Sequence, residues 1–437
     1  MEKTIDKHKR YSFPKDIRVI RHNNKIIVIT PETSNWIVLE SEHQLDMFNF
    51  LCNNSLAESL EKFKGCEEDI SFVVTQIEAR HLESTNTRSN SYDVMQLYLT
   101  NECNMRCPHC YMYAGTALRN ELTTEEIETL LKNFALSGGK KIVMTGGEIG
   151  LRKDLTHIVK WAYDLNLTVE LLTNGTLFDA ETIDILSQHI RRVQVSIDGF
   201  SEESNAKIRG KGNFTKALAT VERFVLNKIP TEIAITPYPS NTLKDEMQGY
   251  IDFGKKLKQK FGDKLLIKYT TGLIDGRTIN RDNVDHKEYE KIMKDIISAV
   301  YGTNDSFSGF VLSARNQVLN DNCAYGALNV SANGDIFPCA KIYQTQKFGN
   351  IRMTDWNTII NKSKRLKQMS NINNIEPCNQ CELKYICGGG CRLDYIPVFA
   401  TTEKLLASKN KPYRICNKKE KDELLDLLIK ANTYIFR

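Results

Sequence analysis

The sequence predicts an α/β protein built around a partial (β/α)6 barrel, with a winged-helix-like module before the barrel and a cysteine-rich domain after it. Three observations lead to this fold class. Strand-like apolar runs alternate with helical segments in the middle of the chain, which is typical of parallel strands covered by helices. The first part of the chain has strand-like segments followed by helical ones. Most of the 12 cysteines fall into two groups, one at the start of the middle region and one near the end.

The composition is that of an ordinary globular protein. A chain of 437 residues has room for two or three domains, and its net charge of +5 gives no reason to expect nucleic acid. No apolar run approaches the roughly 20 residues that a membrane span needs, and the polar residues 1–16 contain no secretory signal. We therefore expect a cytoplasmic protein with no membrane partner. Disulfides are rare in that compartment, so the grouped cysteines favour metal or redox chemistry, whereas Cys52 and Cys66 are expected to be buried thiols.

Residues 1–84 are predicted to form a compact module of strands followed by helices. Apolar and polar positions alternate in residues 18–40 around two turn signals, which predicts a three-stranded meander. Residues 43–62 and 67–82 have helical periodicity, with Leu, Phe and Ile on one face. The polar stretch 83–91 is typical of a linker.

Residues 92–305 are expected to form the barrel. Its predicted strands are 94–100, 141–146, 168–174, 192–198, 232–238 and 265–271, and its predicted helices include 123–137, 154–165, 179–189 and 213–227. Two threonines followed by two glutamates at 123–126 supply helix-start chemistry. In barrels of this type the chemistry lies at the C-terminal ends of the strands. Four short motifs occur at the ends of the first four strands, so we expect them to meet on one rim.

Residues 306–437 are expected to form a separate C-terminal domain. Periodicity is weaker here, and the second group of cysteines lies within 323–416. A final amphipathic helix at 418–432 is expected to pack on the body of the protein.

The motif TNECNMRCPHCY, residues 100–111, contains the first group of cysteines: Cys103, Cys107 and Cys110. Thiolates suit zinc or iron–sulfur clusters. A closed structural zinc site takes four protein ligands, and His109 is poorly placed as the fourth because its direct neighbour would also be a ligand. A cubane of four irons, in contrast, would keep one iron open for an outside molecule.

The spacing of these cysteines, followed by Tyr111, resembles that of the radical S-adenosylmethionine (SAM) superfamily. The resemblance implies that the amino and carboxylate groups of SAM bind the open iron of a 4Fe–4S cluster. An electron from the cluster then cleaves the sulfonium and yields a 5′-deoxyadenosyl radical, which abstracts hydrogen from a substrate. The protein's part is to orient the cofactor and to exclude water.

Further motifs match the SAM-binding positions of that superfamily. The Gly-Gly-Glu segment resembles the motif that receives the methionine amino group, since glycines allow close approach and an ammonium needs a carboxylate and carbonyls. Ile149 stands where proline is common, which is expected to loosen the turn without abolishing the site. The SAM-binding residues implied by the resemblance are Tyr111, Gly146, Gly147, Glu148, Asn174, Ser196, Asp198 and Arg209. No catalytic acid or base is identified.

The second group of cysteines resembles the SPASM pattern of radical enzymes that modify peptides and proteins. The resemblance implies two auxiliary 4Fe–4S clusters, and therefore three clusters in all. One auxiliary cluster would be held by Cys378, Cys381, Cys387 and Cys416, and the other by Cys323, Cys339 and Cys391. Sulfatase-maturing relatives carry an acid where this chain has Ala340, so that activity is not expected.

Seven thiols cannot fully ligate two four-iron clusters, and no cysteine occurs between Cys110 and Cys323. The auxiliary cluster held by only three cysteines, Cys323, Cys339 and Cys391, is therefore expected to have an open iron or a further ligand such as Asp321. An open iron suits a substrate thiolate, so we predict that a peptide cysteine binds there and couples to a carbon radical as a thioether. The alternative is that the auxiliary clusters only relay electrons or stiffen the domain.

The N-terminal module resembles the recognition element of enzymes that act on ribosomally made, post-translationally modified peptides (RiPPs). The likeness is carried by NWIVLE before the helical LDMFNFL. A meander with an exposed edge lets a leader peptide add a strand. Winged helices also bind DNA, but this segment has slightly more acidic than basic residues, whereas a DNA-binding face needs concentrated Lys and Arg.

These resemblances together imply a radical SAM/SPASM maturase of a ribosomal precursor peptide, with a flavodoxin- or ferredoxin-like electron donor. Cysteine thioether crosslinks, as in sactipeptides and ranthipeptides, are the first expectation for the product. Carbon–carbon or carbon–oxygen crosslinking and epimerisation are the other expected reactions. A non-catalytic iron–sulfur redox sensor or peptide-binding scaffold is the alternative from another class.

Overall fold

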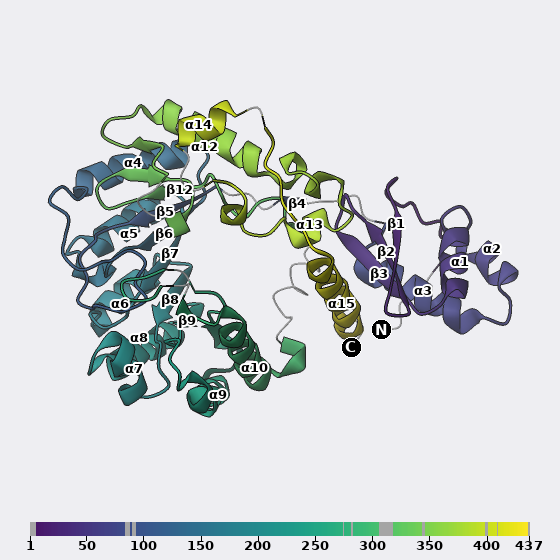
Figure 1. Cartoon of the computed structure of the whole chain (residues 1–437), viewed down its shortest axis with the longest axis horizontal. Helices are drawn as coiled ribbons and strands as arrows, with labels where there is room; N and C mark the ends of the chain where they lie inside the picture. The colour runs from purple at the N-terminus through teal and green to yellow at the C-terminus, as the bar shows by residue number, and fades with distance from the viewer. Residues whose placement is uncertain are drawn as a thin grey trace.

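The computed structural model describes residues 6–83, 88–89, 93–273, 275–280, 283–305, 318–342, 346–397, 401–408 and 410–435. The barrel and the N-terminal module lie at opposite ends of the molecule, and parts of the C-terminal region lie between them (Figure 1). In the part of the chain that the structure describes, no helix is long and apolar enough to cross a membrane.

The N-terminal module contains the predicted meander. Strands β1 (Arg18–His22), β2 (Lys25–Thr30) and β3 (Asn35–Leu39) form an antiparallel sheet in the order β1-β2-β3, followed by helices α1 (Glu42–Leu51), α2 (Leu56–Lys62) and α3 (Glu67–Arg80). The prediction of a single helical segment over residues 43–62 is wrong. The chain breaks after α1, and Ser55 starts α2 with a capping box in which its side chain accepts from the Glu58 N–H.

Both faces of this small sheet are covered. Alternate strand residues, including Ile26, Val28 and Ile37, pack with the helices of the module. The opposite face packs against α15 (Lys418–Ile435), the predicted C-terminal helix, through an apolar cluster of Ile27, Ile29, Trp36, Val38, Leu383, Leu425, Leu428 and Ala431. The C-terminal helix therefore packs on the N-terminal sheet rather than on the barrel (Figure 1). Burial on two faces explains why β2 and β3 are almost uninterrupted apolar runs.

The sequence predicted that the meander has an exposed edge, and this prediction is wrong for the edge formed by β3. The Gln76 side chain of α3 accepts from the Val38 N–H at 3.0 Å and donates to the Val38 carbonyl at 2.5 Å. Arg80 donates to the Trp36 carbonyl at 3.0 Å, and its guanidinium lies 3.5 Å from the centre of the Trp36 ring. Side chains of α3 thus take the backbone positions that an added strand would use.

The barrel has the predicted six parallel strands. They are β5 (Val94–Tyr98), β6 (Lys141–Thr145), β7 (Thr168–Thr173), β8 (Arg192–Ser196), β9 (Thr231–Ile235) and β10 (Leu265–Tyr269), in the order β10-β9-β8-β7-β6-β5. The predicted helices are α4 (Thr124–Leu136), α5 (Leu155–Asp164), α6 (Ala180–Ser187) and α8 (Asn213–Leu226). Periodicity did not identify α7 (Glu202–Arg209), α9 (Leu243–Phe261) and α10 (His286–Asp305).

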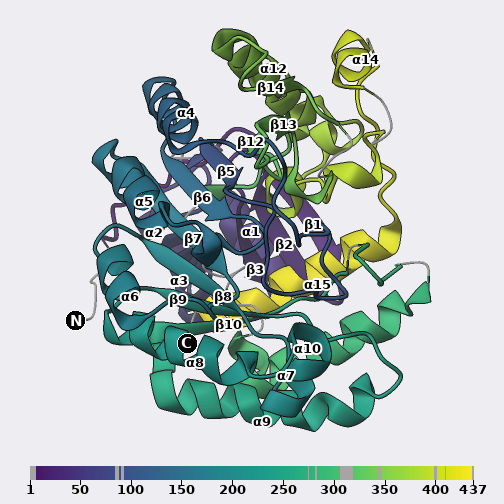
Figure 2. The ribbon, with the colours of Figure 1, turned by 90° about the vertical axis from the view of Figure 1, so that its left-hand side faces the viewer.

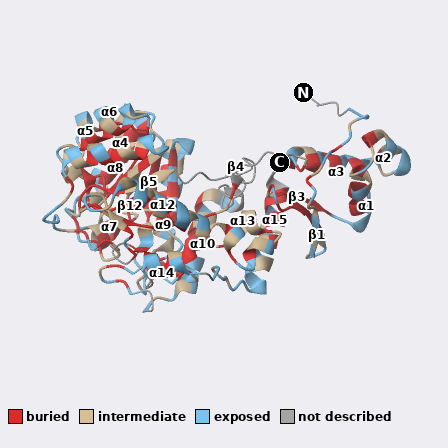
Figure 3. Cartoon of the chain, turned by 90° about the horizontal axis from the view of Figure 1, so that it is seen from above, coloured by how far each residue is buried: buried red, intermediate tan, exposed pale blue. Residues whose placement is uncertain are grey.

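The barrel core lies between the sheet and the helices on its outer side (Figure 1, Figure 2). Buried positions concentrate there and on the N-terminal sheet (Figure 3). The strand positions that alternate with core residues are largely polar. Arg192 joins Glu170 and Glu232 across three neighbouring strands at 3.0 and 2.8 Å. This face of the sheet therefore carries polar side chains that pair with one another rather than a sealed apolar core.

The C-terminal region extends the barrel sheet. Strand β12 (Leu328–Val330) pairs parallel to β5, and β13 (Asp335–Phe337) and β14 (Gly349–Asn350) continue antiparallel, giving a sheet of nine strands. The expected domain boundary at 305/306 and most of the expected linker 83–91 lie outside the described residues. The pair β4 (Arg88–Ser89) and β11 (Val318–Leu319) is described and is parallel.

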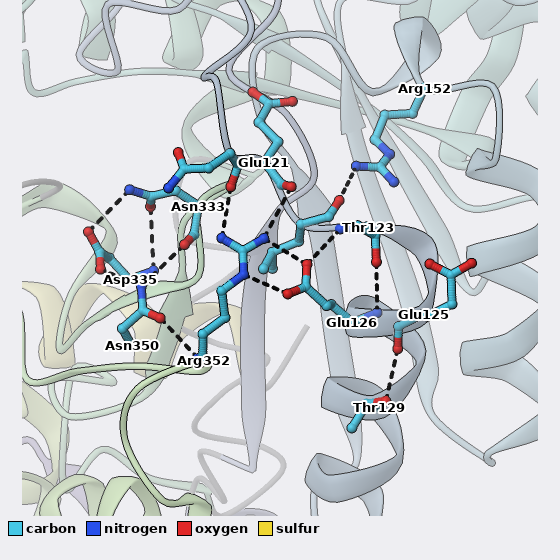
Figure 4. A network of polar contacts seen from close by, with 12 residues as sticks. Glu121, Thr123, Glu125, Glu126, Thr129, Arg152, Asn333, Asp335, Asn350 and Arg352 are labelled. Atoms are coloured by element: carbon cyan, nitrogen blue, oxygen red, sulfur yellow. Dashed lines mark hydrogen bonds and ion pairs between the residues drawn. The ribbon is translucent and has the colours of Figure 1, made fainter.

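The other elements of this region are short, apart from α12 (Trp356–Ser370). They are η4 (Ala340–Ile342), η5 (Ile372–Asn374), η6 (Cys378–Gln380), α13 (Lys384–Cys387), η7 (Arg392–Asp394) and α14 (Thr402–Ala407); η1 (Ile149–Leu151) and η2 (Gly262–Lys264) belong to the barrel. Figure 4 shows how the region is joined to α4. Arg352 forms a two-point ion pair with Glu126 and also donates to the Asn120 carbonyl at 2.9 Å.

Candidate functional site

The four predicted motifs lie together at the C-terminal edge of the barrel strands. The cysteine loop follows β5, the Gly-Gly-Glu segment follows β6, Asn174 follows β7, and Ser196 and Asp198 stand at the end of β8. The cysteine loop is closed at its base by paired backbone bonds. Cys103 N–H donates to the Gly115 carbonyl at 3.1 Å, and Gly115 N–H donates to the Asn101 carbonyl at 2.8 Å. A single short loop therefore presents all three thiols.

The three thiols share one environment. Cys107 is buried, and Cys103 and Cys110 are partly buried. Burial is the main cause that raises the pKa of Cys103 to about 11, and the nearby Cys107 and Cys110 add to it. Among the described residues, no three His, Cys, Asp or Glu side chains converge closely enough to hold a single metal ion. Ligands of a four-iron cluster bind different irons and need not converge, so the donor set fits a cluster better than zinc.

The Gly-Gly-Glu segment packs closely against residues 100–102, which lead into Cys103, because its glycines have no side chains. The Gly147 N–H donates to the Thr100 carbonyl at 2.8 Å, and the Glu148 N–H donates to the Glu102 carbonyl at 2.7 Å. A Cβ on Gly147 would stand 2.1 Å from the Glu102 carbonyl oxygen. Only glycine lets the two segments approach so closely.

Glu148 is held as a preorganised acceptor. Its carboxylate is 1% exposed and accepts from Thr173 Oγ1 at 2.5 Å, Asn174 N at 2.7 Å and Gly150 N at 2.9 Å. Burial raises the pKa of Glu148, while these hydrogen bonds act in the opposite direction. A buried carboxylate fixed in this way suits a cationic group such as an ammonium. Ile149, at the position where proline is common, is fully buried in the barrel core.

Asp198 joins two basic side chains. Its Oδ2 lies 2.5 Å from Arg209 Nε and 3.3 Å from His109 Nε2, and its Oδ1 accepts from the Thr236 N–H at 2.8 Å. Asp198 and Arg209, both predicted to bind SAM, thus form an ion pair with each other. Burial lowers the pKa of His109. Sequence reasoning considered His109 only as a metal ligand and missed this contact, although its place inside the cysteine motif was a signal.

Asn174 and Tyr111 also have partners within the site. Asn174 donates to Asn104 Oδ1, inside the cysteine loop, at 2.8 Å. The Tyr111 hydroxyl lies 3.2 Å from the Tyr98 hydroxyl, and its ring packs in a small apolar cluster with the cysteine loop. Burial raises the pKa of Tyr111, and the charges of both Cys110 and Cys339 contribute. Tyr111 is therefore influenced by one thiol of the cysteine loop, Cys110, and by one thiol of the C-terminal region, Cys339.

The C-terminal thiols gather into the two expected groups. Burial raises the pKa of Cys339, with Cys323 and Cys391 contributing as neighbours. Burial likewise raises the pKa values of the other group, Cys378, Cys381 and Cys416, and Cys387 contributes to each of them. The side chain of Asp321, the expected further ligand, accepts from Asn371 Nδ2 at 3.2 Å.

Sequence reasoning missed the residue that shapes the loop between the two groups. Gly388, Gly389 and Gly390 all have positive φ, from 68 to 76°, a conformation that favours glycine. Arg392 is fully buried and donates to the carbonyls of Gly388 and Gly390, both at 2.7 Å. The glycine turn therefore wraps around Arg392 and fixes the relative positions of the cysteines on either side.

Comparisons with known proteins match both parts of this site. The model of the radical SAM superfamily matches residues 97–252, and that of the SPASM iron–sulfur cluster-binding domain matches residues 322–382. The chain is a radical SAM enzyme with a SPASM domain. Its two domains imply iron–sulfur clusters and SAM as cofactors. The sensor or scaffold that the sequence left open is thereby replaced by an enzyme.

The relatives of this radical SAM enzyme differ in what their names describe. An AdoMet-dependent heme synthase of Methanosarcina barkeri is 27% identical over 67% of this chain and 89% of its own. The antilisterial bacteriocin subtilosin biosynthesis protein AlbA of Bacillus subtilis is 24% identical over 72% of each chain. The solved structure of native anSMEcpe with bound AdoMet and Kp18Cys peptide has a TM-score of 0.57, at 19% identity, over 78% of this chain and 99% of that one.

Proposed function

We propose that this enzyme matures a ribosomally synthesised precursor peptide and forms cysteine thioether crosslinks in it. The observation that carries the proposal is that the same chain holds the cysteine loop and seven further thiols in its C-terminal region, one of which, Cys339, acts electrostatically on Tyr111 beside Cys110. The similarity to AlbA, a protein of bacteriocin biosynthesis, supports a peptide substrate.

In this proposal three 4Fe–4S clusters are held by the residues that the sequence predicts. The cysteine loop would hold the radical cluster, Glu148 would accept the SAM ammonium, and Arg209 would meet its carboxylate. Cys323, Cys339 and Cys391 would hold the cluster that takes the substrate thiol. When bound, these groups would supply a hydrogen-abstracting radical and an acceptor for the electron that the thiol gives up, so the peptide loses two hydrogens as the carbon–sulfur bond forms.

The N-terminal module is proposed to bind the leader of the precursor, as a RiPP recognition element spanning 1–84. Because Gln76 and Arg80 occupy the edge of β3, the leader is assigned to the adjacent groove along α3. The groove has a volume of about 580 Å³ and is lined by Glu67, Glu68, Ser71, Phe72, Thr75 and Gln76. Its two glutamates and the 37% exposed ring of Phe72 suit a peptide with basic and apolar residues. The electron donor would be a flavodoxin- or ferredoxin-like protein of the cytoplasm.

The test uses anaerobically reconstituted full-length enzyme with SAM, dithionite and synthetic peptides that tile the short reading frames flanking the gene. We expect 5′-deoxyadenosine and a peptide that has lost two hydrogens and whose cysteine resists alkylation. A carbon–carbon or carbon–oxygen crosslink would lose the same mass but keep an alkylatable thiol, and epimerisation would leave the mass unchanged. Either result would contradict the thioether product while retaining the peptide substrate.

The similarity to the heme synthase favours a second candidate, a tetrapyrrole substrate, because it covers 89% of that protein. An iron porphyrin added to the reconstituted enzyme would then show a shifted Soret band and would be consumed together with SAM. We expect neither change. Consumption of the porphyrin with no modification of any peptide would replace the peptide proposal.

A further inference from the structure

A short segment after β10, residues 275–280, reaches the cysteine loop from the opposite end of the barrel. In the sheet, β10 is the last barrel strand and β5, which leads into the cysteine loop, is the first. Nevertheless, residues 276–278 contact the loop after β5. The segment therefore crosses the C-terminal edge of the barrel and joins its two ends beside the proposed radical cluster.

Three hydrogen bonds tie this segment to the cysteine loop. The Thr278 N–H donates to the Pro108 carbonyl at 2.8 Å. The Arg277 guanidinium donates to the Ala114 carbonyl at 2.5 Å, and the Tyr113 hydroxyl donates to the Gly276 carbonyl at 3.2 Å. These bonds reach the loop on both sides of Cys110, so they restrain the part that carries its last thiol.

Gly276 is the point of closest approach. A Cβ at this position would stand 2.6 Å from the backbone carbon of His109 and 2.7 Å from its carbonyl oxygen. Backbone atoms of a short loop cannot move aside as the end of a flexible side chain can, so the fit requires glycine. Gly272, between β10 and this segment, is exposed and has no atom within 4 Å of its ideal Cβ.

His109 is also held by a side-chain contact outside this segment. The side chain of His109 is 17% exposed, and its Nε2 lies 3.3 Å from Asp198 at the end of β8. The loop between Cys107 and Cys110 is thus held by Asp198 through His109 and by residues 276–278 through Pro108 and His109.

We propose that residues 275–280 are a strap that positions the cluster-binding loop. Gly276 is the positioning residue, because only glycine lets the strap pack directly against the backbone of His109. The strap sets the placement of Cys107 and Cys110 and thereby the approach of SAM to the cluster. The inference rests on the proposed assignment of the radical cluster to Cys103, Cys107 and Cys110.

The experiment compares Gly276→Val with the matched control Gly272→Val, both as full-length, anaerobically reconstituted enzyme. The readouts are bound iron, SAM affinity by equilibrium dialysis, and the electron paramagnetic resonance spectrum of the reduced protein with and without SAM. We expect the control to match the wild type. In Gly276→Val we expect SAM affinity to fall by at least about tenfold and the SAM-induced spectral change to be lost.

Arg277→Ala covers the case in which Gly276→Val fails to fold, because it removes one strap bond without adding a side chain. It is expected to weaken SAM binding by about two- to tenfold, in line with the loss of one hydrogen bond. If Gly276→Val folds and behaves like Gly272→Val, or if Arg277→Ala leaves SAM affinity and spectrum unchanged, the strap is refuted. A wild-type enzyme with no SAM-dependent spectral change would instead refute the proposed cluster, and the strap with it.

Discussion

The ion pair between Arg352 and Glu126 is expected to stabilise the joint between the C-terminal region and the barrel. Its geometry is bidentate: Arg352 Nε lies 2.5 Å from Glu126 Oε1, and an Nη2–H donates to Oε2 at 2.7 Å (Figure 4). The Glu126 carboxylate also accepts from the Thr123 N–H at the start of α4. Replacing Glu126 by Gln removes the charge but keeps the shape, so the variant isolates the electrostatic part of the joint.

The size of the effect follows from the pKa of Glu126. Arg352 is the main cause that lowers this pKa from 4.5 to about 2. That difference corresponds to at most roughly 3.4 kcal/mol, at 1.36 kcal/mol per pKa unit. Both side chains remain 31% exposed, and solvent screening reduces the expected contribution to about 1–2 kcal/mol. Because the carboxyl is more acidic in the folded state, the contribution is complete above about pH 4.5 and is lost as the pH falls toward 2.

A double-mutant cycle with Glu126→Gln and Arg352→Met measures this contribution in the apo-protein. Urea unfolding can be followed by the fluorescence of Trp356, on α12 in the same region. We expect a coupling energy of about 1–2 kcal/mol at pH 7 that shrinks at pH 3. The control is the exposed helical pair Lys160–Asp164, where the coupling should stay below about 0.5 kcal/mol. Equal coupling in both pairs, or the same Arg352–Glu126 coupling at both pH values, would refute the reasoning.

Three further predictions concern the other parts of the molecule. Trp36→Ala should destabilise the contact of the N-terminal sheet with α15 by about 3–5 kcal/mol in urea unfolding, whereas Val19→Ala, at an exposed strand position, should have little effect. Cys416→Ser should lower the bound iron by up to about four atoms per chain, whereas Cys52→Ser should leave it unchanged, as metal analysis will show. Glu148→Gln should weaken SAM binding by at least about tenfold in equilibrium dialysis, since an amide would replace the buried carboxylate.

Local pattern was sufficient to predict the six barrel strands and four of the barrel helices, although it missed α7, α9 and α10. The strands are short apolar runs between helices with a clear apolar face, and helix α4 begins with a capping box at Thr123, so each predicted element is specified by residues near it in sequence. The thiol groups were predictable for a different reason. Their chemistry is rare, and the spacing of cysteines such as Cys378 and Cys381 is specific even where periodicity is weak.

What the sequence did not reveal depends on contacts between distant residues. The edge of β3 is covered by Gln76, which as a single glutamine on a helix is most simply read as a surface residue. The strap depends on Gly276, which no motif distinguishes from the exposed Gly272 four residues earlier. The break between α1 and α2, in contrast, is a local feature: apolar periodicity continues across the polar residues at 53–55, and the capping box of Ser55 and Glu58 that starts α2 was missed.

The C-terminal helix α15 fixes the position of the N-terminal module relative to Cys381 and Cys387. Its Leu425 and Leu428 pack against the N-terminal sheet and against Leu383, which stands between Cys381 and Cys387. Trp36 Nε1 donates to the Leu428 carbonyl at 3.4 Å, and further along α15 Asn432 donates to Gln76 at 2.9 Å. This apolar core and these bonds hold the module against the segment that carries Cys381 and Cys387. A leader held in the α3 groove would therefore start at a fixed distance from the thiols, and the length of peptide between leader and core would select the residue to be modified.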